Sequence, residues 1–463
     1  MRPFFRRHAV ALVIVVGSAP AVVAQVPTPA LRGGVPSGIA TQDEIPLTLD
    51  DAIARGLQHN LALLLAHDSV EVARGDRREA LADLLPQLRG GLSAVREKIS
   101  LAAFGFSGLG GFPTIIGPFD VVDARGYASQ TLFDLHALGR THSRTEGVNA
   151  ALSEERDTRD LVVLACAQLY LQAVSAQGRI ASARARLATA EALFDLAADR
   201  KRSGLAAGID VLRAQVEREA ERQRVIVAEN EAAKRKLELA RAIGLPLGQA
   251  FRTVDEMPQS PLPSLTREAA LDQAYGARAD LRAAEARVRA ADESRKAARG
   301  EALPSLGVSA DFGAIGNDVA SSRSTYTLAA GMKIPIFEGG KAQAKMQAAN
   351  ARLEEARAAL EDARSRIYYE VQAVFLDLEA SQDRVKVADG AMGLAQQQLQ
   401  QARDRFAAGV AGNIDVVQAQ EALARATDDR IESLFSLNMA KASLARAVGA
   451  AESGYSQFLR GRQ

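Results

Sequence analysis

"RKRSGLAAGIDVLRAQ", residues 200–215, returns later in the chain as "RFAAGVAGNIDVVQAQ", residues 405–420. At a constant offset of 205 residues, eight of the sixteen aligned positions are identical. Both copies interrupt long stretches rich in alanine and charged residues, and neither contains a catalytic motif. Gly204 and Gly409 suit the left-handed residue that ends a helix, whereas Asp210 and Asp415 suit the first turn of the next helix. Each copy is therefore expected to be a short break between a long helix and a returning helix.

The two breaks belong to a longer internal repeat. The offset of 205 holds without gaps over residues 177–244 and 382–449, and further upstream the halves still correspond, with insertions. Each half reads as a helix, a pair of strands, a very long helix, a break and a returning helix. A period of this length indicates a duplicated domain and not a solenoid of small repeats.

The start of the chain resembles a secretory signal. Arg2, Arg6 and Arg7 precede the short apolar run "AVALVIVV", and small residues before Gln25 suit cleavage after Ala24. The run is too short to span a membrane. Cys166 is the single cysteine, which excludes an intrachain disulfide and leaves no cysteine after the signal to carry a lipid. We expect an exported protein that is not a lipoprotein.

The segments follow in a definite order. We predict a signal peptide (1–24), a flexible leader (25–46), a first repeat (47–245), an inter-repeat linker (246–264), a second repeat (265–450) and a C-terminal tail (451–463). Strands are expected at about 86–104, 121–134, 303–315 and 325–337, and the breaks at 204–209 and 409–414.

The long helices carry a coiled-coil seam. Apolar residues recur every three or four positions from Val385 to Phe406, and again from Ile180 to Ala197. The stretch from Thr141 to Ser203 would be roughly 95 Å long as a continuous helix at ~1.5 Å per residue. Such a length suits a tube or a stalk, not a compact domain.

The strands alternate with a period of two. In "LPSLGVSADFG" (303–313) and "YTLAAGMKIPIF" (326–337), apolar residues occupy one face and mostly small or polar residues the other. This pattern is typical of outer-membrane barrel strands, and equally of a half-buried sheet on a soluble domain. Four strands cannot close a barrel in lipid, because open edges leave backbone groups unsatisfied. If the four strands lie in a membrane, strands from other copies of the chain must complete the barrel. A barrel of eight strands and one of twelve are both possible.

The ordered set of motifs resembles the TolC-like outer membrane efflux proteins. The resemblance rests on the two breaks, Gly204–Gln215 and Gly409–Gln420, and on "ADLRAAEARVRAA" (279–291), "LFD" (132–134), "IFEGGK" (336–341) and "RAIGLPLG" (241–248). It implies a mixed α and β membrane protein, internally duplicated, with a long coiled-coil α-helical barrel and a shared transmembrane β-barrel. Each protomer of a homotrimer would contribute four of twelve strands.

The same resemblance implies a transport function without catalysis. The protein would be an outer-membrane exit duct, with its helices in the periplasm, docked by a periplasmic adaptor and an inner-membrane pump of the RND or ABC type. Drug efflux, metabolite export and protein secretion are all compatible with the sequence. No cofactor or metal is implied.

The breaks would lie at the periplasmic tip and form the gate. The resemblance implies that Asp415 of each protomer contributes to a ring of acidic side chains that narrows the pore. Asp210 is the equivalent residue in the first repeat. Where well-known members have a second acid one turn later, this chain has Gln418, and the Arg and Tyr that help to lock their tips correspond to Ala411 and Phe406. We expect a closed state held by tip packing and one acid ring, with a weaker polar lock.

The turns themselves resemble the adaptor-facing surface of the family. The residues concerned are Gly204, Leu205, Ala206, Gly409, Val410 and Ala411.

Other classes of function are disfavoured. The net charge is +1, and −2 once the signal is removed, and no basic patch interleaved with aromatic residues points to a nucleic acid. His59, His67, His136 and His142 lack metal-ligand spacing, and no G-x-S-x-G or H-E-x-x-H occurs. The alternative from another class is a soluble periplasmic coiled-coil scaffold or adaptor, which would explain the helices but not the four alternating segments.

Overall fold

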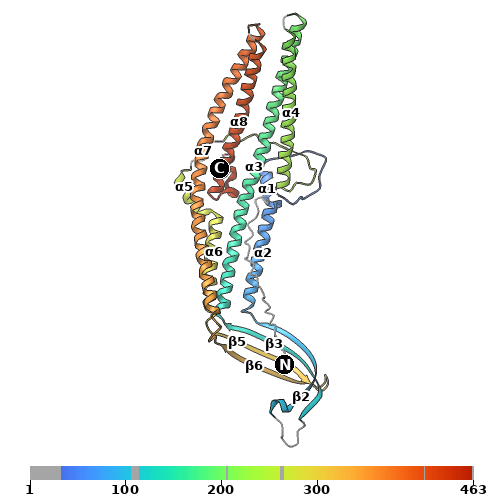
Figure 1. Ribbon diagram of the computed structural model, residues 1–463, viewed down its shortest axis with the longest axis vertical. Helices are drawn as coiled ribbons and strands as arrows, with labels where there is room; N and C mark the ends of the chain where they lie inside the picture. The colour runs from blue at the N-terminus through green and yellow to red at the C-terminus, as the bar shows by residue number, and fades with distance from the viewer. Residues whose placement is uncertain (1–32, 106–113, 205–206, 261–264, 411, 461–463) are drawn as a thin grey trace, which may run out of the picture.

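The protomer is long and narrow, with a β-sheet at one end and two helical hairpins reaching to the other (Figure 1). The computed structural model describes residues 33–105, 114–204, 207–260, 265–410 and 412–460. In chain order the elements are β1 (Ile45–Leu47), α1 (Leu49–His59), α2 (Leu61–Ala82), β2 (Gln87–Ser100), η2 (Leu101–Phe104), β3 (Ile115–Phe133), α3 (Leu135–Arg202), α4 (Gly208–Ala242), β4 (Phe251–Thr253), α5 (Arg267–Ala277), α6 (Ala279–Gly300), β5 (Ser305–Gly316), β6 (Arg323–Lys333), α7 (Lys341–Ala407), α8 (Asn413–Ala447) and α9 (Ala451–Arg460).

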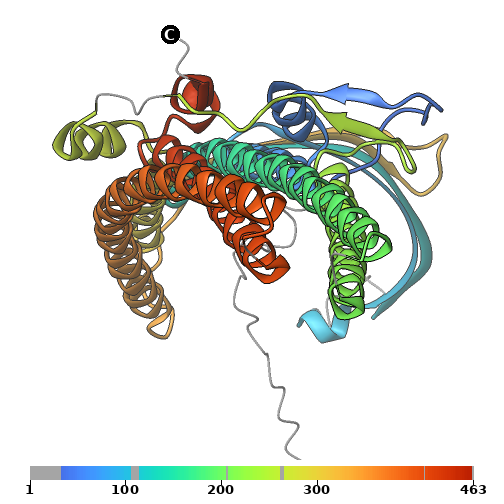
Figure 2. The same ribbon diagram turned by 90° about the horizontal axis from the view of Figure 1, so that it is seen from above.

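The helical hairpins are the pairs α3–α4 and α7–α8. Helix α3 has 68 residues, about 100 Å at ~1.5 Å per residue, so its start lies earlier than expected. The predicted seam is confirmed, since Ala183, Ala190, Ala388 and Ala395 are all buried. Viewed from above, the helices lie side by side along an arc and do not form a closed bundle (Figure 2).

One stretch of α3 is apolar enough to cross a membrane by length and composition. Half of that stretch is buried inside the protomer. Its residues around Val162 and Tyr170 pack in the largest apolar core described below. Burial in the protein therefore accounts for the apolar composition of this helix.

Each repeat begins with two helices where one was expected. Asn60 ends α1 and begins α2, and its side chain accepts a hydrogen bond from the Ala62 N–H at 3.0 Å. In the second repeat, Arg278 separates α5 from α6 in the same extended conformation. Each first helix starts at a threonine N-cap, Thr48 or Thr266, so the local sequence accounts for its beginning. The Asn60 cap also accounts for the break in the first repeat, whereas Arg278 forms no side-chain cap in the second.

The four long strands form one antiparallel sheet in the order β2-β3-β5-β6. The hairpin of the first repeat joins the hairpin of the second through β3 and β5, where Gly126 lies opposite Phe312. Strand β3 begins six residues before the expected 121, and β6 ends at Lys333, four before the expected 337. Strands β2 and β6 occupy the two edges of the sheet.

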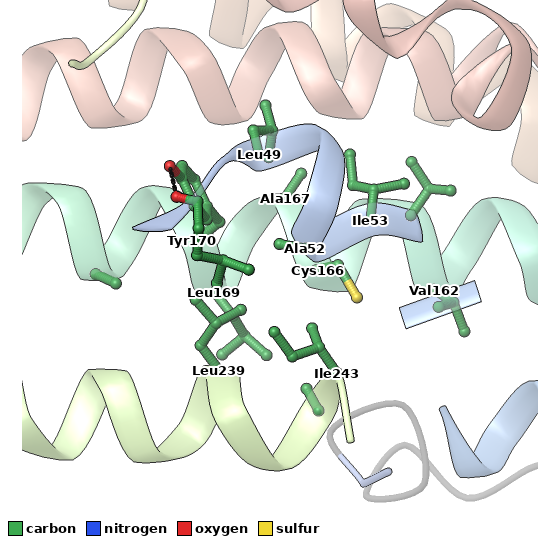
Figure 3. Close-up of a cluster of buried hydrophobic side chains, with 14 of the residues drawn as sticks. Leu49, Ala52, Ile53, Val162, Cys166, Ala167, Leu169, Tyr170, Leu239 and Ile243 are labelled. Carbon is green, nitrogen blue, oxygen red and sulfur yellow. Dashed lines mark hydrogen bonds between the residues drawn. The ribbon is translucent and has the colours of Figure 1, made fainter. Parts of the chain in front are cut away.

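The apolar core nearest the middle of the molecule joins α1, α3 and the end of α4. Figure 3 shows Ile53 of α1 and Cys166 of α3 side by side, with Leu239 of α4 and Ile243, the C-cap residue of that helix, on the other side of α3. The hydroxyl of buried Tyr170 donates to the Leu47 carbonyl at 2.9 Å. This core fixes α3 near its midpoint.

The expectation of a flexible leader is wrong for residues 33–46. Within this segment the Val35 N–H donates to the His59 carbonyl at 2.8 Å, and β1 pairs in parallel with β4 of the inter-repeat linker. The leader is held because its backbone satisfies donors and acceptors that α1 and the linker leave open.

Candidate functional site at the hairpin tips

The two breaks lie at the end of the molecule farthest from the sheet (Figure 1). The expected bounds need correction, because α4 already begins at Gly208 and α8 at Asn413. Gly409 has φ +75°, and the N–H groups of Gly409 and Val410 donate to the carbonyls of Phe406 and Arg405, both at 3.1 Å. This is a Schellman ending, in which a glycine satisfies the last carbonyls of the helix. Gly204 has φ +73° at the equivalent place.

The two aspartates lie in the first turns of the returning helices. The Asp210 N–H donates to the Ala207 carbonyl at 3.1 Å, and that of Asp415 to the Gly412 carbonyl at 3.3 Å. Asp210 also lies 3.8 Å from Arg213 in an exposed pair of the kind that contributes little. Asp415 is exposed, and among the described residues it forms no ion pair within 4.0 Å. The two equivalent carboxylates therefore differ in their electrostatic surroundings.

Phe406 lies inside the protomer. Its side chain is 8% exposed and packs in an apolar cluster with Leu193 of α3 and with Leu399, Val416 and Ala419 of the second hairpin. The cluster joins the two hairpins just below the turns, so the position that lacks the family's tyrosine hydroxyl still supplies an interhelical contact.

A residue that the sequence reasoning missed completes this contact. The Arg200 guanidinium, in the last turn of α3, lies 4.4 Å from the centroid of the Phe406 ring. It also donates to the carbonyls of Phe406 and Ala407 at 2.8 and 3.1 Å. These carbonyls are at the C-terminal end of α7, where a cation is favoured by the helix dipole, and that of Phe406 also accepts the Gly409 N–H. We call this set of contacts the Arg200 clasp.

The clasp is the end of a longer stripe on α3. Arg179 pairs with Glu432 at 2.7 Å and Arg186 with Asp428 at 3.4 Å, both across to α8. Leu193 and Arg200 follow at the same spacing of seven residues, which keeps side chains on one face of a coiled-coil helix. The heptad spacing 179, 186, 193, 200 was the signal in the sequence that could have revealed this seam.

Gln418 lies in a groove between α4 and α8, close to the tips. The groove has a volume of about 440 Å³. Its walls are lined by Ile209, Leu212, Arg213, Val216 and Glu217 of α4 and by Ile414, Val417, Gln418 and Glu421 of α8. Burial raises the pKa of Glu217, with further contributions from Glu221 and Glu421. The groove thus offers apolar side chains beside two carboxylates, Glu217 and Glu421, and the guanidinium of Arg213.

The docking residues expected from sequence are described only in part. Gly204 and Gly409 end their helices as expected, and Val410 has 68% of its surface exposed. Leu205, Ala206 and Ala411 lie outside the residues that the structure describes.

The chain matches the outer membrane efflux protein family over residues 52–245 and 270–450. It is 26% identical over 419 residues to the pyoverdine export outer membrane protein OpmQ of Pseudomonas putida, covering 86% of this chain and 84% of the relative. It is 24% identical over 318 residues to the alkaline protease secretion protein AprF of Pseudomonas aeruginosa, covering 65% of this chain and 64% of that protein. Its fold is similar to the crystal structure of the outer membrane protein VceC of Vibrio cholerae, with a TM-score of 0.74, 23% identity, and coverage of 87% and 96%.

The protein belongs to the outer membrane efflux protein family, since the match covers most of the chain in both repeats. It is an outer-membrane exit duct, with the sheet in the outer membrane and the helical portion in the periplasm. The soluble scaffold considered above is thereby excluded, and the predicted fold class is confirmed.

Proposed function

We propose that three copies of this chain close into one duct of twelve strands and twelve long helices. Two observations support this arrangement. The sheet has unpaired edges at β2 and β6, which in lipid must pair with strands of neighbouring copies. The helices of one protomer also lie along an arc that is open at both ends (Figure 2). Three such arcs joined edge to edge would form a tube continuous with the barrel.

Within that duct, Asp415 is the principal residue of a tip gate. Its carboxylate is exposed, stands in the first turn of α8 and has no basic partner in the described part of the protomer. Three such carboxylates around a narrow pore would attract cations and repel anions. Asp210 is the weaker candidate because Arg213 offsets its charge. Gln418 adds a polar wall one turn further along, and Phe406 acts through the Arg200 clasp.

The turns are proposed as the docking surface for a periplasmic adaptor that couples the duct to an inner-membrane pump. The turn residues are Gly204, Leu205 and Ala206 in the first repeat and Gly409, Val410 and Ala411 in the second. Exposed Val410 offers an apolar contact at the extreme tip. The named relatives serve pyoverdine export and protease secretion, so a role in export of a small molecule or a protein is compatible with the family. We infer that the duct itself carries out no catalysis.

The gate is tested by the zero-current potential of purified trimers in planar bilayers under a KCl gradient. Asp415→Asn should reduce the cation preference, because three carboxylates leave the narrowest part of the path. Asp429→Asn is the control, since it removes an exposed carboxylate from the same helix 14 residues away. An unchanged potential in Asp415→Asn channels that still migrate as trimers on unboiled gels would reject this gate.

A further inference from the structure

The polar face of the sheet carries a charge pattern of its own. Side chains alternate between faces along a strand, and paired residues share a face. The register therefore places Arg89 and Glu97 of β2, Asp123 and Arg125 of β3, Asp311 of β5, and Arg323 and Lys333 of β6 on one face. These are four basic and three acidic residues, a net charge of +1 for each protomer.

The opposite face is apolar and strongly exposed. Leu88 and Leu92 of β2 are each 80% exposed, and Tyr326, Leu328 and Met332 of β6 are also exposed. An outer-membrane barrel turns such a face towards lipid and its polar face towards the lumen. The seven charged residues therefore line the lumen.

Two of the three acids are ion-paired with a single arginine, which leaves this cluster one net negative charge. The Arg125 guanidinium forms ion pairs with Asp311 and, at 3.3 Å, with Asp123, and it donates to the Thr325 hydroxyl at 2.9 Å. Space for this arrangement comes from Gly313, opposite Arg125 in the register, where a Cβ would lie 2.7 Å from the Arg125 Cα. The guanidinium fork is saturated by fixed partners, so these carboxylates are not free to attract a solute.

The remaining basic residues are not neutralised in this way. Arg89, Arg323 and Lys333 are exposed, and within the residues that the structure describes none of them forms an ion pair within 4.0 Å. Glu97 is the one acid of this face outside the Arg125 cluster. The lumen thus presents three exposed cations against one exposed carboxylate and the one uncompensated negative charge of the Arg125 cluster, a net charge of +1 for each protomer.

We infer that the barrel lumen attracts anions, because Arg89, Arg323 and Lys333 are distributed along its length, and that it favours the passage of anionic solutes such as carboxylates. The inference rests on the proposed closure of the sheet by neighbouring copies, which would bring three sets of these residues around one path. It assigns opposite net charges to the two ends of the duct, negative at the tip and positive in the membrane. The proposed preference for anions is that of the barrel, whereas the ring of Asp415 carboxylates proposed at the tip would favour cations.

The test is the chloride-to-potassium permeability ratio of reconstituted trimers, measured for an Arg89→Gln and Arg323→Gln double variant. The ratio should fall roughly two- to threefold, the size of a change of about one kT in the lumen potential. Glu97→Gln should raise the ratio, because it removes the exposed carboxylate of the same face. Each variant is made in both the natural and the Asp415→Asn background, so that the tip does not obscure the barrel.

Arg96→Gln is the matched control. Arg96 lies on the apolar face of β2, next to Asp120 at 3.8 Å. Its replacement removes one positive charge per protomer from the side away from the lumen, where the double variant removes two from the lumen. Conducting trimers whose ratio is unchanged in the double variant, or changed equally by Arg96→Gln, would overturn the inference. Failure to form any channel in the natural protein would instead contradict the shared barrel.

Discussion

The Arg200 guanidinium of α3 stacks 4.4 Å from the centre of the Phe406 ring of α7 and caps the carbonyl of the same residue at 2.8 Å. One side chain of the first repeat thus contacts both an aromatic ring and a terminal carbonyl of α7 in the second repeat. Any widening of the tip that separates the two hairpins of a protomer must break both contacts together.

Arg200→Ala should loosen the closed tip. The cation–π contact and the charged hydrogen bonds together suggest a loss of about 1–2 kcal/mol, enough to shift a two-state equilibrium roughly five- to thirtyfold towards the open form. Single-channel recordings should show a higher open probability or conductance. Arg202→Ala is the control, because Arg202 pairs with Asp199 in its own helical turn. Equal conductance in both variants would remove the clasp from the gating mechanism.

Val410→Asp should impair export while leaving the trimer intact. Val410 is 68% exposed at the turn, so the substitution costs little folding free energy but places a charge where an apolar contact with the adaptor is proposed. Export by cells and adaptor pull-down report the effect, with trimers verified on unboiled gels. Ile39→Asp is the comparison, since Ile39 is 91% exposed in the segment before β1. Normal export by the Val410 variant would place docking elsewhere.

Replacing two glycines of α3 by alanine should change the stability of the protein in opposite directions. A Cβ at Gly139 would lie 2.8 Å from the Ala297 backbone nitrogen of α6, whereas a Cβ at Gly147 would meet nothing within 4 Å. Gly139→Ala should therefore destabilise the protein by about 1–3 kcal/mol through overpacking. Gly147→Ala should stabilise it by up to about 1 kcal/mol, because alanine favours the helix. Thermal unfolding of the two variants should move in opposite directions, and a shared direction would contradict the close approach of α3 and α6.

Asp157 should make stability depend on pH. Burial raises the pKa of this carboxyl to about 6, against the lowering effect of Arg446 and with a further rise from Asp280. Between its ordinary value near 3.8 and about 6, the folded protein holds a proton that the unfolded chain releases, so stability falls as pH rises through that window. The ionised form costs at most about 3 kcal/mol at neutral pH.

Asp157→Asn should therefore flatten the change in melting temperature between pH 5 and pH 7.5, values chosen on either side of this pKa of about 6. Asp429→Asn, at an exposed position of α8, should leave the change as it is in the natural protein. A pH profile that stays the same after Asp157→Asn would assign the effect to other groups, of which Asp160, whose pKa burial also raises, is the first to examine.

Much of the architecture could be predicted because its signals are local. The coiled-coil seam, the alternating strands and the glycine-aspartate breaks each depend on a few neighbouring residues. The ordered leader was not predictable in this way, because Val35 is held by a backbone carbonyl of α1 and not by any pattern in its own segment. The Arg200 clasp could have been suspected from its heptad spacing, but not its partner, which is 206 residues away.

The sequence by itself determined the repeat, the types of element and the places where the long helices turn back, because periodicity and turn chemistry act over short distances. Only the tertiary structure decided which charges meet. Arg125 reaches Asp311 across the seam between the repeats, and Arg200 reaches Phe406, while Asp415 carries no ion pair among the described residues. Those relationships depend on how hairpins cross and on strand register, which set distances between residues far apart in the chain. For this protein, the proposed gate and the proposed lumen both depend on that packing.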